Sequence, residues 1–176
     1  SENKVIVKNY TKFKVKILGA TLFSILSEAV ETYENDKLIN FKSHTYQNKK
    51  EKYVNLDYNN DTNKFDIDGS SYKGEASVDN IIGNWWNHKI LDADKQISPL
   101  SGSIKEQVVK FIGKESLIIN NKEYKANHYT LKSKNEDMPD DKKLNFDVWY
   151  DAEKKTILKV SYSKLGDWEY RLKGIE

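Results

Sequence analysis

The chain of 176 residues is long enough to bury a core without disulfides, and it has no cysteine, which excludes a disulfide framework and a thiolate metal site. Its 29 basic and 27 acidic residues leave a net charge of +2, too small to predict a strong field toward nucleic acid or an anionic membrane. No apolar run approaches the roughly 20 residues of a membrane-spanning helix, and we predict a single domain over residues 1–176.

The N-terminal part predicts strands with different degrees of burial. Residues 12–17 alternate between apolar side chains and lysines, which is typical of a half-exposed or edge strand. Residues 17–26 are apolar on both faces, so either a tight turn at Gly19-Ala20 begins a new strand or one long strand bends there. Such an element is expected to be covered on both sides, by a helix, a closing barrel or a partner.

The next part of the chain predicts a series of strands joined by short polar turns. The extended segments are residues 22–34, 37–47, 52–59 and 64–68. A turn is expected at Asn35-Asp36, and a four-residue turn over 48–51 would place Phe41 opposite Tyr58.

Residues 76–100 lose the period of two and predict one short helical segment near residues 78–90. Strands resume at 104–113, 116–119 and 122–133, and Asn120-Asn121 is a good two-residue turn because asparagine tolerates positive φ. An acidic loop over residues 134–143 then leads into the last group of strands.

The C-terminal segment, residues 144–174, gives the clearest pattern, three antiparallel strands with their apolar side chains on even positions. The connecting loops predict that Phe146 lies opposite Val160 and that Val160 lies opposite Tyr170. The whole chain therefore predicts a mainly β fold of about ten strands, a single up-and-down antiparallel sheet curled into a half-barrel or barrel.

No stretch of the sequence carries a catalytic or cofactor motif. His44, His88 and His128 form no metal-binding pattern, and the eight glycines include no phosphate-binding loop. Asp147 and Glu169 could serve as paired carboxylates, but they fall on the polar face of the C-terminal strands, where ion pairing is the ordinary role. We therefore predict no enzyme activity, no catalytic residue, no metal and no cofactor.

The quartet Trp85-Trp86-Asn87-His88 is the most unusual motif. In one interpretation it forms the lip of a ligand cavity, with indole faces for an apolar guest and Asn87 to orient it. In the other, the two indoles fill one end of a curled sheet and each N–H needs a partner.

Several ordered motifs resemble a family of uncharacterised bacterial exported proteins, classed as a domain of unknown function. They are KFKVKILGATLF at 12–23, ETYENDKL at 31–38, Trp86-Asn87, VWYD at 148–151 and WEYRL at 168–172. This chain departs from the family pattern at Tyr33, where the family has tryptophan, and at Lys37, where it has glycine. The hairpin that usually precedes this region has no counterpart, so an open sheet edge is expected near the N-terminus.

The resemblance implies a location more than an activity. Members usually carry a signal peptide, which implies a periplasmic or secreted protein, and none is visible in this chain. Because the chain begins with Ser1, we expect a processed or engineered product that lacks its targeting segment. Neighbouring families have curled antiparallel sheets of the lipoprotein-carrier type, a shape that often holds lipid, and no reaction is assigned to them.

The sequence thus favours a non-enzymatic protein that binds a lipid or other apolar or amphipathic molecule on the concave face of its sheet. The expected ligand-binding residues are Trp85, Trp86, Asn87, Phe146, Val148, Tyr150, Tyr162, Trp168 and Tyr170. One alternative is an interaction module that completes its sheet with a partner strand or in a homodimer. A less favoured alternative is a hydrolase with a cryptic carboxylate or histidine site. No nucleic-acid partner and no transmembrane segment are expected.

Overall fold

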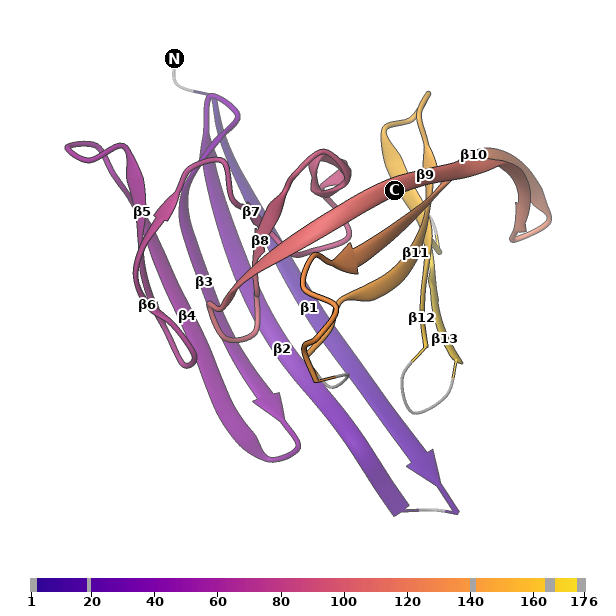
Figure 1. The fold of residues 1–176 in the computed structure, drawn as a ribbon, viewed down its shortest axis with the longest axis horizontal. Helices are drawn as coiled ribbons and strands as arrows, with labels where there is room; N and C mark the ends of the chain where they lie inside the picture. The colour runs from indigo at the N-terminus through magenta and orange to yellow at the C-terminus, as the bar shows by residue number, and fades with distance from the viewer. Residues whose placement is uncertain (1–2, 19, 140–141, 164–166, 174–176) are drawn as a thin grey trace. The chain divides into compact units, whose positions relative to one another are not determined.

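The computed structural model describes residues 3–18, 20–139, 142–163 and 167–173 (Figure 1). Within these ranges the fold is mainly β, with thirteen strands and one 3₁₀ helix. The predicted fold class is therefore confirmed, but the strands form two sheets, of six and seven strands, where one sheet of about ten was expected. The chain divides into two compact units, residues 1–80 with 97–104, and residues 81–96 with 105–176. The single domain stays a prediction.

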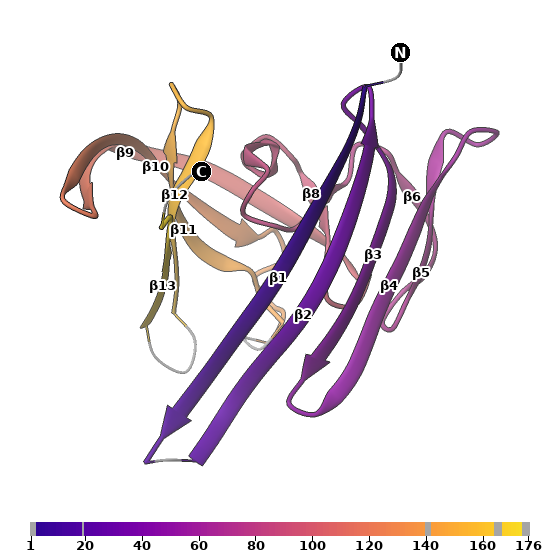
Figure 2. The same cartoon turned by 180° about the vertical axis from the view of Figure 1, so that it is seen from behind.

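The six-stranded sheet runs in chain order from β1 to β6, and each neighbouring pair is antiparallel (Figure 2). Its strands are β1 (Lys4–Ile17), β2 (Ala20–Glu34), β3 (Lys37–Gln47), β4 (Lys50–Asn59), β5 (Lys64–Gly69) and β6 (Lys73–Ser77). The first strand ends at Ile17 and the second begins at Ala20, which pairs with Ile17, so a tight turn rather than a bent strand is present, one residue earlier than the predicted Gly19-Ala20. β1 is an edge strand of this sheet.

Two-residue turns connect several of these strands. Asn35 and Asp36 form the predicted turn, with φ of 49° and 62°. The next turn is shorter than expected, because Asn48 and Lys49 both take positive φ and β4 already begins at Lys50. This turn matches the right-handed twist of the strands, and it places Phe41 opposite Leu56 instead of Tyr58.

One face of the six-stranded sheet forms a core. Phe41, Leu56 and Ile67 lie opposite one another on successive strands and are buried. The same face carries Ser27 and Thr45, whose hydroxyl groups are 2.7 Å apart and hydrogen-bonded. Since buried polar groups are costly without partners, this pair lets two polar residues occupy core positions.

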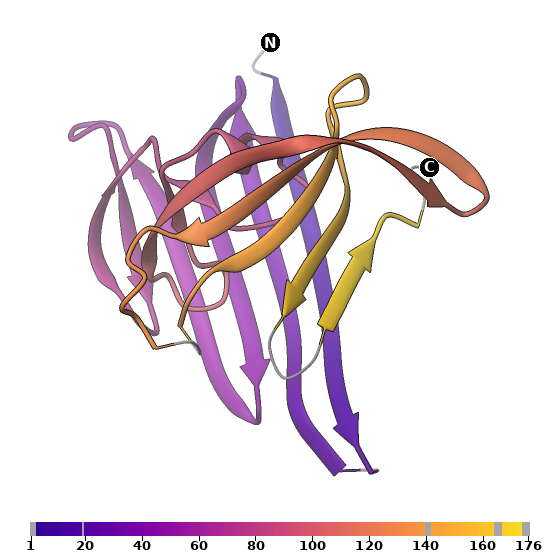
Figure 3. The same cartoon turned by 45° about the vertical axis from the view of Figure 1, so that its right-hand side comes forward.

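The seven-stranded sheet has the order β13-β12-β11-β10-β9-β8-β7 (Figure 3). Its strands are β7 (Ile81–Ile82), β8 (Lys95–Ile97), β9 (Ile104–Ile119), β10 (Lys122–Ser133), β11 (Asn145–Asp151), β12 (Thr156–Ser163) and β13 (Asp167–Arg171). The 3₁₀ helix His88–Leu91, η1, lies between β7 and β8. The predicted helical segment near 78–90 is thus reduced to a single turn that begins later.

For the long hairpin of β9 and β10, the predicted turn is confirmed and the predicted break in the first strand is wrong. Asn120 and Asn121 form the predicted two-residue turn, with φ of 51° and 62°. The segments 104–113 and 116–119 are one continuous strand, β9, because its pairing with β10 continues past Gly113 through a register shift at His128/Tyr129. Figures 1 and 3 show how strongly these two strands curve.

The C-terminal strands form the predicted meander with one change of register. Val160 lies opposite Tyr170, as predicted. Phe146 lies opposite Tyr162 rather than Val160, two residues from the predicted register. The loop is one residue shorter than expected, because Asp151 already pairs with Thr156, and the pairing shifts by one further residue between Trp149 and Tyr150. Such a bulge adds one residue to one strand, so the even positions of β11 and β12 still lie opposite one another although the loop length differs from the prediction.

Candidate functional site

One face of the seven-stranded sheet carries a compact apolar cluster. Ile90 of η1, Leu131 of β10, Val148 of β11 and Val160 of β12 are fully or almost fully buried and pack together. These strand residues share a face because they lie directly opposite one another or two positions apart along neighbouring strands. The cluster is the floor against which several of the predicted binding residues pack.

A row of three aromatic rings borders this floor. Phe146 contacts Trp85 with ring centroids 4.8 Å apart at 67°, and it contacts Tyr162 at 4.8 Å and 24°. All three side chains are half-buried. We refer to Trp85, Phe146 and Tyr162 as the aromatic row. Direct cross-strand pairing of Phe146 with Tyr162 holds two of these rings together.

The loop before η1 holds the third ring of the row. The Asn87 backbone N–H donates to Asn84 Oδ1 at 3.2 Å, and Asn87 Oδ1 accepts from the Lys89 backbone N–H at 3.1 Å. These bonds fold the chain tightly on both sides of the tryptophan pair, and Asn87 thereby acts as the N-cap of η1. Trp85 points to the cluster, while Trp86 is 41% exposed.

His88 and Tyr150 extend the aromatic surface beside the row. Their rings are stacked at 5.5 Å with an angle of 13°. Burial, and after it the nearby charge of Asp92, raises the pKa of Tyr150, so its hydroxyl is neutral at neutral pH. The surface next to the cluster therefore combines apolar ring faces with an uncharged phenol.

The structure brings together most of the predicted ligand-binding residues, but not all. Phe146, Val148 and Tyr150 belong to the cluster with Trp85, and Tyr162 joins it through Phe146. Val148 itself is fully buried and serves as floor. Tyr170, opposite Val160, is 41% exposed at the sheet edge. The side chain of Trp168 lies outside the described part of the chain.

The opposite face of the same sheet carries a polar network around His128. Its Nδ1 lies 2.8 Å from Glu115 Oε1, and its Nε2 lies 2.7 Å from Asp147 Oδ1. The imidazole also stacks on Trp149, with ring centroids 4.4 Å apart at 12°. Trp149 Nε1 in turn donates to Glu115 Oε2 at 2.7 Å, which closes the network.

Two cations continue this network toward the sheet edge. Lys159 lies above the Trp149 ring, 4.1 Å from its centroid, and pairs with Glu169 at 2.8 Å. Arg171 also binds Glu169, at 2.7 Å. Hydrogen bonds from Lys159 and then Arg171 lower the pKa of Glu169. The expectation of ion pairing on this face is confirmed for Glu169. Asp147 bonds to His128, so Asp147 and Glu169 do not form a carboxylate pair.

The pKa of Glu115 provides a test of this network. The hydrogen bond from Trp149, followed by the one from His128, lowers the pKa of Glu115 below its ordinary value of 4.5. We expect Trp149→Phe to keep the ring stack, remove the N–H donor and raise the pKa of Glu115 toward that value. Carboxyl NMR titration measures this change.

The control for this measurement is Glu106, whose pKa is lowered chiefly by its hydrogen bond from Lys95 and should not respond. The lowered pKa of Glu115 also makes the stability of the folded state depend on pH. The stabilisation from Glu115 is present above pH 4.5 and is lost as the pH falls through its lowered pKa. An unchanged Glu115 titration in Trp149→Phe would show that the indole does not set its charge.

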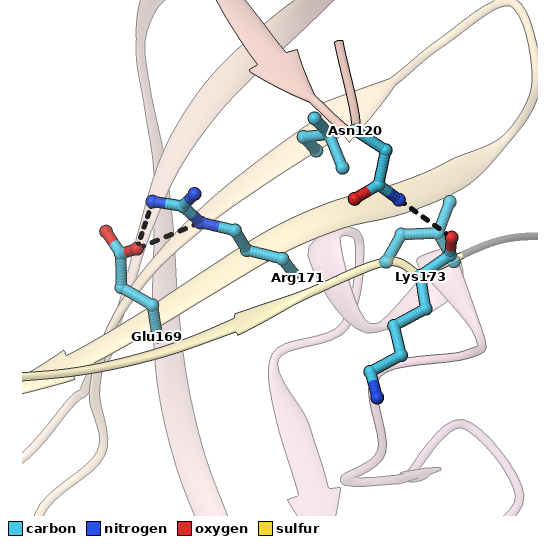
Figure 4. Close-up of a pocket in the computed structure, with 6 residues that line it drawn as sticks. Asn120, Glu169, Arg171 and Lys173 are labelled. Atoms are coloured by element: carbon cyan, nitrogen blue, oxygen red, sulfur yellow. Dashed lines mark hydrogen bonds and ion pairs between the residues drawn. The ribbon is translucent and has the colours of Figure 1, made fainter. Parts of the chain in front are cut away.

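A hollow of about 320 Å³ lies where β13 meets the turn between β9 and β10 (Figure 4). Asn120 Nδ2 donates to the Lys173 carbonyl oxygen at 2.9 Å, and Arg171 is turned toward Glu169 (Figure 4). The hollow is open to solvent, and four of the six residues that line it are polar or charged. None of the predicted ligand-binding residues lines it.

The three histidines do not form one centre. His44 is bonded to Glu51 in the six-stranded sheet, His88 stacks on Tyr150, and His128 lies on the other face of the second sheet. Within the described ranges, no group of three or more histidine, cysteine, aspartate or glutamate residues could hold a metal ion. In the same ranges, no helix has the length and apolar character to cross a membrane.

Comparison with known proteins places the chain in a family. A sequence model for the domain of unknown function DUF6134 matches residues 1–173. The chain belongs to DUF6134. This membership confirms the resemblance to an uncharacterised family, and the match extends over both compact units. No curated protein and no solved structure shows significant similarity to the chain.

The part of this DUF6134 site that sequence reasoning missed is the His128 network. Asp147 was expected to find its partners on β12 or β13, yet its partner comes from β10, across the acidic loop. The pairing of Thr130 with Asp147 and of His128 with Trp149 brings the groups together. The available signal was the alternation in β10, where His128 has the parity opposite to Leu131.

Proposed function

We propose that this DUF6134 protein is a non-enzymatic binding protein of the periplasm or cell surface, which holds an apolar or amphipathic ligand against the aromatic row. The observation that carries the proposal is the continuous contact of Trp85, Phe146 and Tyr162. Trp85 and Phe146 pack against the floor of the cluster, Tyr162 stacks on Phe146, and each ring keeps part of its surface exposed.

Half-buried aromatic rings are suited to such a ligand for a physical reason. They present large, rigid surfaces whose burial is favourable, and they lose little side-chain entropy on binding. The fully buried floor, which includes Leu131 and Val148, keeps these rings in place before a ligand arrives. Preorganisation of this kind supports binding more than it supports a reaction.

The absence of a shared histidine or metal centre in the described ranges supports a binding role over hydrolysis. The alternative of strand addition at β1 has less support, because lysines alternate along that strand and discourage pairing at an edge. The proposed location derives from the resemblance to exported proteins, whose members usually carry a signal peptide.

Titration with cis-parinaric acid, a fluorescent fatty acid, tests the proposal. We expect saturable binding by the wild type and a weakening of about 3- to 10-fold in Phe146→Leu, the range that one aromatic contact contributes. Leucine keeps apolar bulk at this half-buried position, so the variant should remain folded. A thermal melt of each variant checks that it does.

The matched control is Phe23→Leu, which removes a half-buried ring from the Phe13–Phe23 pair of the six-stranded sheet. This variant should bind the probe like the wild type. The proposal is rejected if the wild type shows no saturable binding, or if Phe23→Leu weakens binding as much as Phe146→Leu does.

A further inference from the structure

The hairpin of β1 and β2 extends beyond the rest of its sheet. β3 pairs with β2 only from Ile25 to Glu34, so the residues nearer the tip pair only with each other. Ser24 holds the hairpin to the turn between β3 and β4, because its backbone N–H donates to Asn48 Oδ1 at 2.8 Å. Figures 1 and 2 show this two-stranded ribbon projecting past the turn between β3 and β4.

The tip carries an apolar residue against local preference. The two-residue turns of three other hairpins begin with Asn35, Asn48 and Asn120, at φ of 49°, 50° and 51°. Leu18 takes the same place with φ of 49°, although leucine pays a steric cost there that asparagine largely avoids. Leu18 is also fully exposed, and Leu22 across the hairpin is 49% exposed. Neither backbone preference nor burial explains why leucine occupies these two positions.

Basic residues occupy β1, and neither β1 nor the first half of β2 contains an acidic residue. Residues 3–27 contain five lysines and no acidic residue, which leaves 24 basic and 27 acidic residues in the rest of the chain. The second half of β2 carries Glu28, Glu31 and Glu34, so the excess of positive charge lies along β1 and toward the tip, while the chain outside residues 3–27 is slightly acidic. Lys12 and Lys14, close to the tip, are exposed.

We propose that the tip of the β1–β2 hairpin docks on an anionic lipid surface. Leu18 and Leu22 enter the boundary between headgroups and acyl chains, while Lys12 and Lys14 stay at the level of the phosphates. Anionic lipids complement a cluster of lysines near an apolar tip, and each such lysine adds to the attraction. This site is separate from the aromatic row and does not depend on it.

The lysines also discriminate against a second copy of the chain as the occupant. In an antiparallel pair of β1 strands centred on Tyr10, Lys8 of one copy would lie opposite Lys12 of the other. Like charges directly opposite each other are destabilising, and edge lysines commonly prevent such pairing. A lipid surface has no such conflict.

Vesicle flotation tests the proposal with the whole chain. Vesicles are made of phosphatidylcholine alone or of a two-to-one mixture with phosphatidylglycerol. We expect binding to the anionic vesicles, which weakens at high salt, and little binding to the neutral ones. Leu18→Asn combined with Leu22→Thr should weaken binding about tenfold or more. Asparagine suits the turn and threonine suits a strand, so this variant should fold well.

Two matched variants complete the experiment. Ile118→Thr removes an apolar side chain that is 73% exposed near the tip of the other long hairpin, and it should not change binding. Lys12→Gln with Lys14→Gln should weaken binding about tenfold, whereas Lys110→Gln with Lys114→Gln should do so much less. The proposal is overturned if anionic vesicles do not bind the wild type, or if Ile118→Thr weakens binding equally. It is also overturned if the two leucine substitutions dissociate a dimer and leave vesicle binding unchanged.

Discussion

Leu131→Ala should lower the free energy of unfolding by about 2–5 kcal/mol. Leu131 is fully buried in β10, directly opposite Phe146, and packs in the cluster with Ile90 and Val148. Truncation removes apolar contacts and leaves a cavity that two paired strands cannot easily collapse. Equilibrium urea unfolding, followed by tryptophan fluorescence, measures the loss.

The control is Leu26→Ala, at a position that is 40% exposed on the six-stranded sheet. This substitution should lower the free energy of unfolding by less than about 1 kcal/mol, because it removes little apolar contact. Equal losses in the two variants would show that the cluster beneath the aromatic row is not a tightly packed floor.

Gly69→Ala should also destabilise the protein strongly, by about 1–3 kcal/mol. A Cβ at this position would lie 2.7 Å from the carbonyl oxygen of Ser101 and 3.0 Å from the Cα of Gly102. The obstruction is backbone, which cannot rotate away as a side chain does. The segment is also fixed by the hydrogen bond from the Ser71 N–H to the same Ser101 oxygen, at 2.9 Å.

Gly113→Ala is the matched change for this position, because a Cβ at Gly113 would meet no atom within 4 Å. It should leave the midpoint of thermal unfolding unchanged or raise it, since alanine reduces the entropy of the unfolded chain. If Gly69→Ala melts at the wild-type temperature, the close approach of β5 to the Ser101 loop is not as the structure shows.

The identity of most strands could be predicted from the alternation of side chains and from asparagine turns. β3 and β10 have the predicted bounds, 37–47 and 122–133. Turn residues with positive φ bound β3 at both ends and β10 at its start. The opposition of Val160 and Tyr170 was also predictable, because parity restricts the register to a few choices.

The predicted strand register was wrong where one strand contains an extra residue. The shift between Trp149 and Tyr150, added to a loop one residue shorter than expected, places Phe146 opposite Tyr162, and no local sequence pattern predicts this shift. Asp151 contributes to this change, since its Oδ1 accepts the backbone N–H groups of Glu153 and Lys154 and shortens the loop. The division into two sheets depends on the irregular residues between β6 and β9, whose path is set by tertiary contacts.

The candidate site was predictable in its apolar part and not in its polar part. The even positions Phe146, Val148 and Tyr150 share a face by alternation alone, and Trp85 stood out by composition. The bonds of His128 with Glu115 and Asp147 join three strands, β9, β10 and β11. They follow only from the registers of those strands, which the sequence does not specify across the acidic loop.

Native mass spectrometry of the protein purified from its producing cells tests the central claim, that the aromatic row holds an apolar or amphipathic molecule. We expect a fraction of the wild type to carry a noncovalent small-molecule adduct, which is reduced in Phe146→Leu and retained in Phe23→Leu. A wild type that carries no adduct, and that gains none when an excess of oleic acid is added, would contradict the claim.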